Sequence, residues 1–243
     1  MATLYESSKN VSEISTDISC MRTAYCSFTD TLLEEHIIKN PFKLFKDWFD
    51  VASKCKQIEE PNAMCLATAT KDGYPSARYV LLKYFDHEGF TFFTNYNSRK
   101  GKELEENPNV AVVFYWEPLH RSIRIEGIVS KIDANKSTEY FQSRPKESQI
   151  GACVSNQSSV ICNRDVLTND LIKLKQKFEN EAIPRPQNWG GFRIAPRKFE
   201  FWQGQSNRLH DRILFRQPQP NEKLDENVTH IAEEGWVYER LAP

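Results

Sequence analysis

Residues 200–212 contain many side chains that can bind an anion or transfer a proton. They read Glu-Phe-Trp-Gln-Gly-Gln-Ser-Asn-Arg-Leu-His-Asp-Arg, with two arginines, one histidine, two acids and three amides. The first part alternates like a strand, and residues 204–207 are turn formers. If the chain then resumes as a strand, Arg208, His210 and Arg212 share one face. This cationic row predicts a bound anion, although the polar outer face of a hairpin would show the same alternation.

Two pairs of basic residues occur earlier in the chain. Arg78 and Lys83 stand at the ends of an apolar run, on opposite sides of a regular strand unless a bulge intervenes. Arg99 and Lys100 fall in the first turn of a short predicted helix, where backbone N–H groups and the helix dipole favour a phosphate. A solvated helix start is the alternative for this second pair.

A further cluster combines a phenol, a guanidinium and a hydroxyl. Tyr140, Arg144 and Ser148 are spaced by four residues along a predicted helix and its exit. Arginine binds phosphate in a fork, so the trio suits a phosphate monoester. Gln157 and Ser158 are possible polar additions to these sites.

The sequence lacks the common motifs for metal, nucleophilic or dinucleotide chemistry. It does not have the two Glu-x-x-His motifs of a carboxylate-bridged metal site, and it has no His-Glu-x-x-His, no Gly-x-Ser-x-Gly, no Walker loop and no Gly-x-Gly-x-x-Gly. Several anion sites without such motifs predict that a non-covalently bound cofactor carrying a phosphate performs the difficult step. We expect no metal ion.

The elements that must position these groups are mainly strands. The pattern predicts a helix from Asn40, strands over 63–70, 75–84, 90–94, 110–116 and 122–131, and a short helix capped by Ser98. Helices follow at 135–143, 146–154 and 164–182, and strands return from 189 to 240. A β meander interrupted by one short helix favours a small β barrel with flanking helices over a parallel sheet.

Composition limits the class of protein. Lys plus Arg number 32 against 33 Asp plus Glu, and this balance argues against a nucleic-acid coat or a membrane-surface protein. The six cysteines are widely spaced and include no Cys-x-x-Cys pair, which predicts reduced thiols rather than a zinc site. With no apolar run long enough to span a membrane, we expect a cytoplasmic protein, with residues 1–35 as a mobile arm and 36–243 as one domain.

Several motifs together resemble one enzyme family. They include Arg-Tyr-Val-Leu-Leu-Lys at 78–83, Ser-Arg-Lys-Gly at 98–101, Tyr-Phe-Gln-Ser-Arg-Pro at 140–145 and Arg-Leu-His-Asp-Arg at 208–212. From about residue 40 to the end, the chain is similar to pyridoxine (pyridoxamine) 5'-phosphate oxidases. The resemblance implies a mainly β fold with flanking helices, a Greek-key-like FMN-binding split β barrel that forms a homodimer.

The resemblance also implies an activity. FMN-dependent oxidation by O2 would convert pyridoxine 5'-phosphate and pyridoxamine 5'-phosphate to pyridoxal 5'-phosphate in vitamin B6 salvage. The products would include H2O2, and ammonia from the amine. Hydride transfer would run from substrate C4′ to flavin N5, with Arg208 and His210 as the catalytic pair over the pyridine ring. No nucleic acid or membrane partner is expected.

Site residues can be carried over motif by motif. FMN would contact Arg78, Tyr79, Val80, Leu81, Phe93, Thr94, Arg99, Lys100, Gln157, Ser158, Trp202 and Arg212. Substrate would contact Lys83, Tyr140, Arg144, Ser148, Arg208 and His210. Arg22 and Tyr25 match a short arm motif that can close over the substrate in the family.

One residue departs from the family pattern. Ser122 stands where the family usually has a glutamine that contacts the flavin. Because a hydroxyl is shorter than that amide, this contact would be lost or bridged by water. This departure leaves one alternative open, an FMN-binding split-barrel protein with reduced or altered oxidase activity. A second alternative, a barrel that binds nucleic acid through its basic clusters, is disfavoured by the balanced charge.

Overall fold

The computed structural model of the chain describes residues 18–21 and 32–243. The predictions for Arg22 and Tyr25, and for most of the expected arm, fall outside the described residues.

Helix α1, Pro41–Lys54, begins as the sequence predicts. The Asn40 side chain accepts hydrogen bonds from the backbone N–H groups of Phe42 at 3.0 Å and Lys43 at 3.2 Å. These bonds satisfy two of the donors that a helix start leaves unpaired. Apolar residues at helical spacing then face the core, including Leu44, Phe45, Trp48 and Ala52.

Within the part of the chain that the structure describes, ten strands form one antiparallel sheet. They are β1 Ala63–Ala69, β2 Pro75–Leu81, β3 Tyr84–Asp86, β4 Gly89–Asn95, β5 Asn109–Trp116, β6 Arg121–Lys131, β7 Trp189–Gln203, β8 Asp211–Arg216, β9 Thr229–Ile231 and β10 Val237–Arg240. The main order is β2-β1-β5-β6-β7-β8-β10-β9, and β4 pairs with β3 and β7. The expected mainly β architecture is confirmed.

The barrel is split between β2 and β4. The sequence predicted one strand over 75–84, but this strand breaks at Leu82 and Lys83. The Leu82 N–H donates to the Asn62 carbonyl and the Lys83 N–H to the Thr91 carbonyl, both at 2.9 Å. The chain thus passes from pairing with β1, as β2, to pairing with β4, as β3. The barrel strands β1, β5, β6, β7 and β4 are linked by hydrogen bonds, and the covalent connection from β2 to β3 completes the ring. This change of partner is non-local, so the apolar run could not reveal it.

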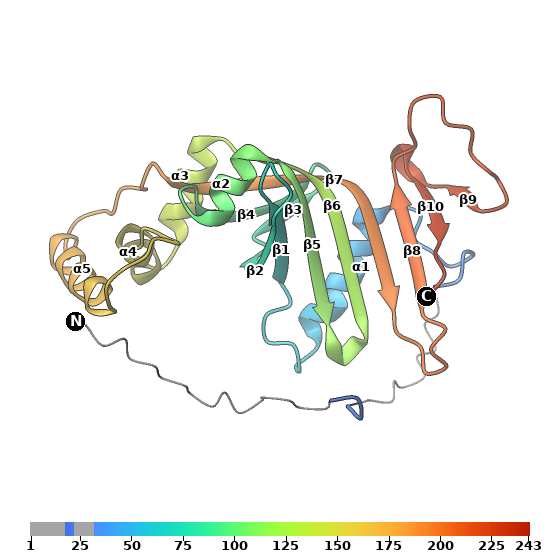
Figure 1. Cartoon of the computed structure of the whole chain (residues 1–243), viewed down its shortest axis with the longest axis horizontal. Helices are drawn as coiled ribbons and strands as arrows, with labels where there is room; N and C mark the ends of the chain where they lie inside the picture. Colours follow the sequence, from blue (N-terminus) through green and yellow to red (C-terminus); the bar gives the residue numbers. More distant parts are fainter. Residues whose placement is uncertain (1–17, 22–31) are drawn as a thin grey trace, which may run out of the picture.

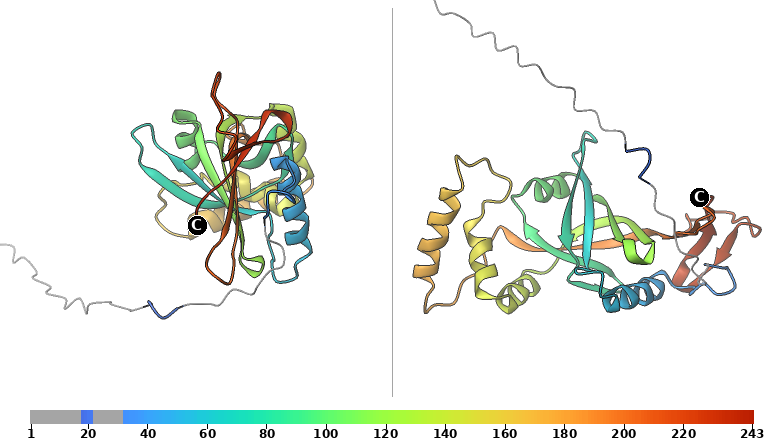
Figure 2. Two further views of the ribbon diagram at one scale, coloured as in Figure 1. Left: turned by 90° about the vertical axis from the view of Figure 1, so that its right-hand side faces the viewer. Right: turned by 90° about the horizontal axis from the view of Figure 1, so that it is seen from below.

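Strand β7 connects the two ends of the molecule. It is 15 residues long, and its register against β6 shifts between Glu126 and Gly127. Its first half pairs with β4 and its second half with β8. Helices α3, α4 and α5 lie at one end of the molecule, and β8, β9 and β10 lie at the other (Figures 1 and 2).

The remaining helices are α2 Arg99–Glu106, α3 Ala134–Ser143, α4 Lys146–Val154 and α5 Asp165–Lys177, with 3-10 turns at Glu117–Leu119 and Glu233–Gly235. Helix α5 is shorter than predicted, since it ends at Lys177 rather than near residue 182. Its expected buried stripe is only partial, because Leu167 is exposed while Leu171 and Leu174 pack on a small cluster. The stripe faces one layer of side chains instead of a full core.

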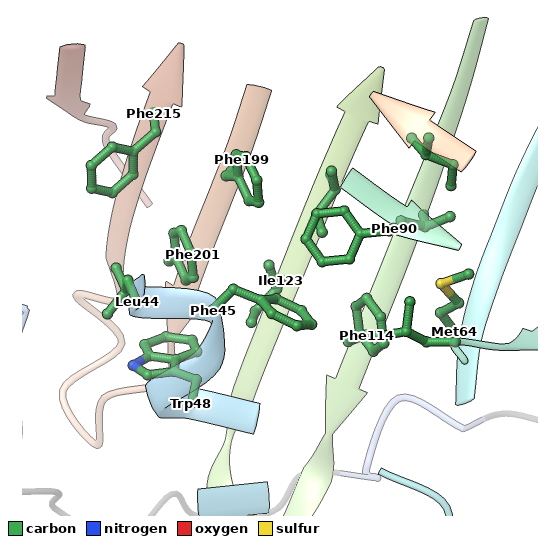
Figure 3. Packing of buried hydrophobic residues seen from close by; sticks show 14 of the residues in the cluster. Leu44, Phe45, Trp48, Met64, Phe90, Phe114, Ile123, Phe199, Phe201 and Phe215 are labelled. Atoms are coloured by element: carbon green, nitrogen blue, oxygen red, sulfur yellow. The ribbon is translucent and has the colours of Figure 1, made fainter. Parts of the chain in front are cut away.

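Two apolar clusters hold these elements in place. The large one packs α1 against one face of the sheet, with Phe45, Trp48, Phe114 and Phe201 among its members (Figure 3). The small one lies under α3 and α4 and consists of Phe141, Ile150, Phe178, Ile183 and Trp189. Burial of this much aromatic surface is the main stabilising contribution. Within the described ranges, no helix is both long and apolar enough to cross a membrane.

Candidate functional site

A cavity of about 650 Å³ opens where β2 and β4 meet α2, α3 and α4. Its wall contains many of the predicted site residues, namely Tyr79, Val80, Leu81, Lys83, Phe93, Thr94, Lys100, Tyr140, Arg144, Ser148 and Gln157. The break after β2 brings Lys83 to this wall, while Arg78 faces a buried hydrogen-bond network outside it. The structure thus unites contacts predicted for two different ligands.

Arg144 is held in the cavity wall by aromatic rings. Its guanidinium carbon lies 4.8 Å from the centre of the Trp189 ring. Its Nη1 atom is buried and has no hydrogen-bond partner among the described residues. Burial lowers the pKa of Arg144, and the neighbouring Tyr140 partly offsets this effect. A buried guanidinium with an unsatisfied donor favours an anionic ligand.

Tyr140 belongs to a stack of three rings. Its ring lies 3.9 Å from that of Phe93, and Phe93 lies 5.4 Å from Trp189. Burial raises the pKa of Tyr140, so the phenol stays protonated and can donate a hydrogen bond at neutral pH. Sequence reasoning missed Trp189, which only opened a strand in the pattern. Its place between Arg144 and Phe93 depends on the tertiary packing of β7 against α3.

Lys100 projects from the first turn of α2 into the cavity wall. Its Nζ donates to Gln157 Oε1 at 2.9 Å and to Thr94 Oγ1 at 3.3 Å. Burial, with a smaller effect from Arg78, lowers the pKa of Lys100. Helix α2 can lie this close to the turn that precedes it because residue 101 is glycine: a Cβ there would come within 2.1 Å of the Tyr96 carbonyl oxygen.

Three further residues predicted to contact FMN, Arg78, Arg99 and Ser158, lie around this cavity rather than in its wall. Arg99 and Ser158 line a neighbouring hollow of about 570 Å³, to which Gln157 also contributes. Arg78 is bound within the protein, with Nη1 donating to the Leu66 carbonyl at 3.2 Å. Its other terminal nitrogen, Nη2, donates to Ser76 Oγ and Glu103 Oε2.

Four predicted site residues form a separate β7–β8 cluster, which consists of Trp202, Arg208, His210 and Arg212. It does not reach the cavity, because Trp189 and Trp202 stand near opposite ends of β7. A strand of this length extends on the order of 45 Å. A single chain therefore does not bring together all the residues predicted for one site.

The prediction that Arg208, His210 and Arg212 share one face of a strand is wrong in part. Strand β8 begins at Asp211, so Arg208 and His210 lie in the loop before it. Arg208 has φ 67°, which breaks the alternation on which the prediction depended. Arg212 lies on the strand and pairs with Glu200 at 2.8 Å. The conformation of the loop at residues 204–210, rather than strand alternation, therefore sets where the Arg208 and His210 side chains point.

His210 has a defined orientation in this loop. Its Nδ1 accepts the backbone N–H of Gln205 at 3.0 Å, and its ring lies 4.9 Å from that of Trp202. Burial and the Arg208 charge lower the pKa of His210, while Asp211 opposes this shift. Ser122 lies beside the same cluster, since it pairs with Trp202 across β6 and β7.

We find no candidate metal site in residues 18–21 and 32–243. No group of three or more His, Cys, Asp or Glu side chains in this part of the chain is arranged to hold an ion.

Family models match most of the chain. One described as "Pyridoxamine 5'-phosphate oxidase" covers residues 53–178, and one described as "Pyridoxine 5'-phosphate oxidase C-terminal dimerisation region" covers residues 189–243. The β7–β8 cluster falls within the second region.

Named relatives are similar over nearly the whole length. A pyridoxine/pyridoxamine 5'-phosphate oxidase of Bombyx mori is 51% identical over 238 residues, which is 97% of this chain and 93% of the relative. A pyridoxine-5'-phosphate oxidase of Bos taurus is 52% identical over 229 residues, which is 93% of this chain and 88% of the relative.

Solved structures share the fold. PhzG from Burkholderia lata, in complex with tetrahydrophenazine-1-carboxylic acid, aligns with TM-score 0.77 and 28% identity over 88% of this chain and 98% of its own. A pyridoxamine 5'-phosphate oxidase-related, FMN-binding protein from Nostoc punctiforme aligns with TM-score 0.61 over 84% of this chain and 98% of its own. At 14% identity the second shows the fold alone. With this split-barrel fold and these relatives, the chain belongs to the pyridoxine/pyridoxamine 5'-phosphate oxidase family.

Proposed function

We propose that this protein is an FMN-dependent oxidase. With O2 it converts pyridoxine 5'-phosphate to pyridoxal 5'-phosphate and H2O2. With O2 and water it converts pyridoxamine 5'-phosphate to pyridoxal 5'-phosphate, H2O2 and ammonia. The observation that carries the proposal is the buried, unsatisfied Nη1 of Arg144 in the cavity wall beside Tyr140.

The substrate phosphate fits this part of the cavity. Arg144 supplies a charged donor, and Tyr140, Ser148 and Lys83 line the same wall. Charge-assisted hydrogen bonds of this kind are stronger than neutral ones. The ring stack behind Arg144 limits its movement, so less conformational entropy is lost when the phosphate binds.

FMN fits the adjoining part. Lys100, Thr94 and Gln157, with the chain at Tyr79–Leu81, would hold it, and Arg99 and Ser158 extend the anion site. When bound, FMN would accept the hydride from substrate C4′ and pass the electrons to oxygen. The protein's own part is to orient the substrate and to exclude water from the cavity.

A homodimer completes the site in this proposal. Arg208, His210, Trp202 and Arg212 are predicted to act with the cavity residues, yet they lie at the other end of β7. A second copy in two-fold arrangement can bring its β7–β8 cluster to the first copy's cavity. Exposed Tyr79 on β2 and Tyr115 on β5 support an interface on the outer face of the sheet, away from the buried core, because aromatics are enriched in interfaces.

A direct assay tests the activity. The purified protein is expected to show flavin absorbance, to bind FMN if flavin-depleted, and to release peroxide when pyridoxine 5'-phosphate is added. Failure to bind FMN would overturn the proposal. FMN binding without turnover would favour the alternative, a flavin-binding split barrel with altered activity. Ser122 in place of the usual glutamine is the reason to consider this alternative.

Mixed dimers test the shared site. Arg144→Ala and His210→Ala variants should each lose most activity, whereas their mixture, after subunit exchange, should regain about a quarter of the wild-type rate. Recovery arises because half of the dimers are mixed and each holds one intact site. A mixture as inactive as its components would show that one chain supplies both residues. The cytoplasmic location stays a prediction.

A further inference from the structure

Glu103 is a buried carboxylate on α2 that none of the proposed ligand contacts uses. Its side chain is 5% exposed, and both of its oxygens accept hydrogen bonds. Oε2 accepts from Thr68 Oγ1 at 2.5 Å and from Ser76 Oγ at 2.6 Å. Oε2 also accepts from Arg78 at 3.2 Å, while Oε1 accepts from Arg99 Nε at 2.8 Å. One carboxylate therefore ties two strands to two arginines.

The carboxylate is ionised throughout the neutral range. Burial alone would raise the pKa of Glu103, but hydrogen bonds from Ser76, Thr68, Arg99 and Arg78 outweigh it and lower the pKa to about 2. A carboxylate that is charged at neutral pH thus lies at the wall of the hollow that Arg99 and Ser158 share.

We infer that Glu103 is a positioning residue for the cofactor phosphate. Its carboxylate orients the Arg99 guanidinium toward the phosphate and holds the Arg78 guanidinium in place between β1 and β2. This inference rests on the proposed binding of FMN. Glu103 engages Arg99 through Nε, so the two terminal nitrogens can point to the hollow shared with Ser158. Arg99 is otherwise 61% exposed and would sample many rotamers.

The charges balance in this arrangement. Arg99 and Lys102 line the hollow together with Glu103 and Glu106, and Arg78 and Lys100 lie beside them. Four positive and two negative charges leave two to meet a phosphate monoester of about −1.5 to −2. Glu103 also acts on Lys100, whose pKa is lowered by burial and by Arg78 and raised by Glu103. The carboxylate therefore helps Lys100 to remain charged in a site from which water is partly excluded.

Because riboflavin lacks the phosphate of FMN, a comparison of the two flavins measures the contribution of the phosphate to binding. The dissociation constants of both flavins are measured by fluorescence quenching with flavin-depleted wild-type protein and Glu103→Gln. We expect the variant to bind FMN about tenfold more weakly, since the arginine is no longer preorganised, and riboflavin within about twofold of wild type. A role in folding alone would weaken both flavins alike.

Matched variants complete the test. Glu103→Asp keeps the charge and should recover part of the FMN preference, and Glu105→Gln alters an exposed acid of the same helix and should behave as wild type. Arg99→Gln removes the exposed partner of Glu103 and leaves the buried side chains around the carboxylate unaltered. The double variant with Glu103→Gln should lose less FMN affinity than the two single losses predict together.

Two results overturn the inference: tighter FMN binding by Glu103→Gln, which would show that the carboxylate repels the phosphate, or equal losses for both flavins. If Glu103→Gln does not fold, Glu103→Asp and Arg99→Gln carry the same comparison. Wild-type protein that binds FMN no better than riboflavin would instead refute the proposed cofactor contacts, and the inference with them.

Discussion

Nδ1 of His210 accepts a hydrogen bond from the backbone N–H of Gln205 at 3.0 Å. In a neutral imidazole, an accepting Nδ1 places the proton on Nε2. The loop between β7 and β8 thus fixes both the ring orientation and the tautomer. In the proposed enzyme, this presents an N–H donor to the substrate at neutral pH.

The protonation of His210 can be tested by titration. Burial and Arg208 lower its pKa, so the ring should become charged only below its ordinary value of about 6.5. Arg208→Gln removes a positive neighbour and should move the His210 pKa upward. NMR of labelled histidine in the FMN-bound protein measures both values, and a downward shift or none would contradict this account.

Arg208 lies in the left-handed region with φ 67°. A residue with a Cβ is strained there, whereas glycine is not. Arg208→Gly should therefore unfold at higher urea than Arg208→Ala, by about 0.5–1 kcal/mol in the free energy of unfolding.

The adjacent Leu209 provides a matched control for that comparison. It is also exposed, but it does not have a positive φ. Leu209→Gly should be less stable than Leu209→Ala, because glycine gains more freedom in the unfolded chain. The same order at both positions would contradict the strained geometry of Arg208.

Trp189 supports Arg144 from behind at 4.8 Å. Trp189→Leu removes the aromatic face and should raise KM for pyridoxine 5'-phosphate about tenfold, with a smaller change in kcat. Trp189→Phe keeps an aromatic face and should stay closer to wild type. If both variants change kcat and leave KM alone, Trp189 does not act through Arg144.

Ser122 and Trp202 are neighbours across β6 and β7. Ser122→Gln supplies the longer amide of the family pattern and should lower the FMN dissociation constant several-fold, since one more hydrogen bond contributes about 1 kcal/mol. Ser130→Gln, farther along β6, serves as the control. Unchanged FMN affinity in Ser122→Gln would show that the position does not contact the flavin.

Local features of the fold were predictable from the sequence. Asn40 caps α1 and Ser98 caps α2 as expected, because a side-chain oxygen bonds to an N–H only two or three residues away. Most strands were found for the same reason, since alternation of apolar residues is read within one segment. Phe199 and Phe201, two positions apart on β7, are both fully buried, as alternation in a strand requires.

Features that depend on distant partners were not predictable. The strand break at Leu82 and Lys83 follows from a change of pairing partner from β1 to β4. The side-chain role of Trp189 follows from packing between β7 and α3. An alternating pattern contains no information about which strand lies alongside.

The sequence by itself determined the inventory of chemical groups: several clusters of basic residues, a histidine with two nearby arginines, and no common metal or nucleophile motif. The tertiary structure decided how they are divided. It gathers Lys83, Tyr140, Arg144 and Ser148 at one end of β7 and leaves Arg208 and His210 at the other. The reason is that side-chain chemistry is carried by each residue, whereas proximity depends on strand pairings between segments about a hundred residues apart, such as β4 with β7.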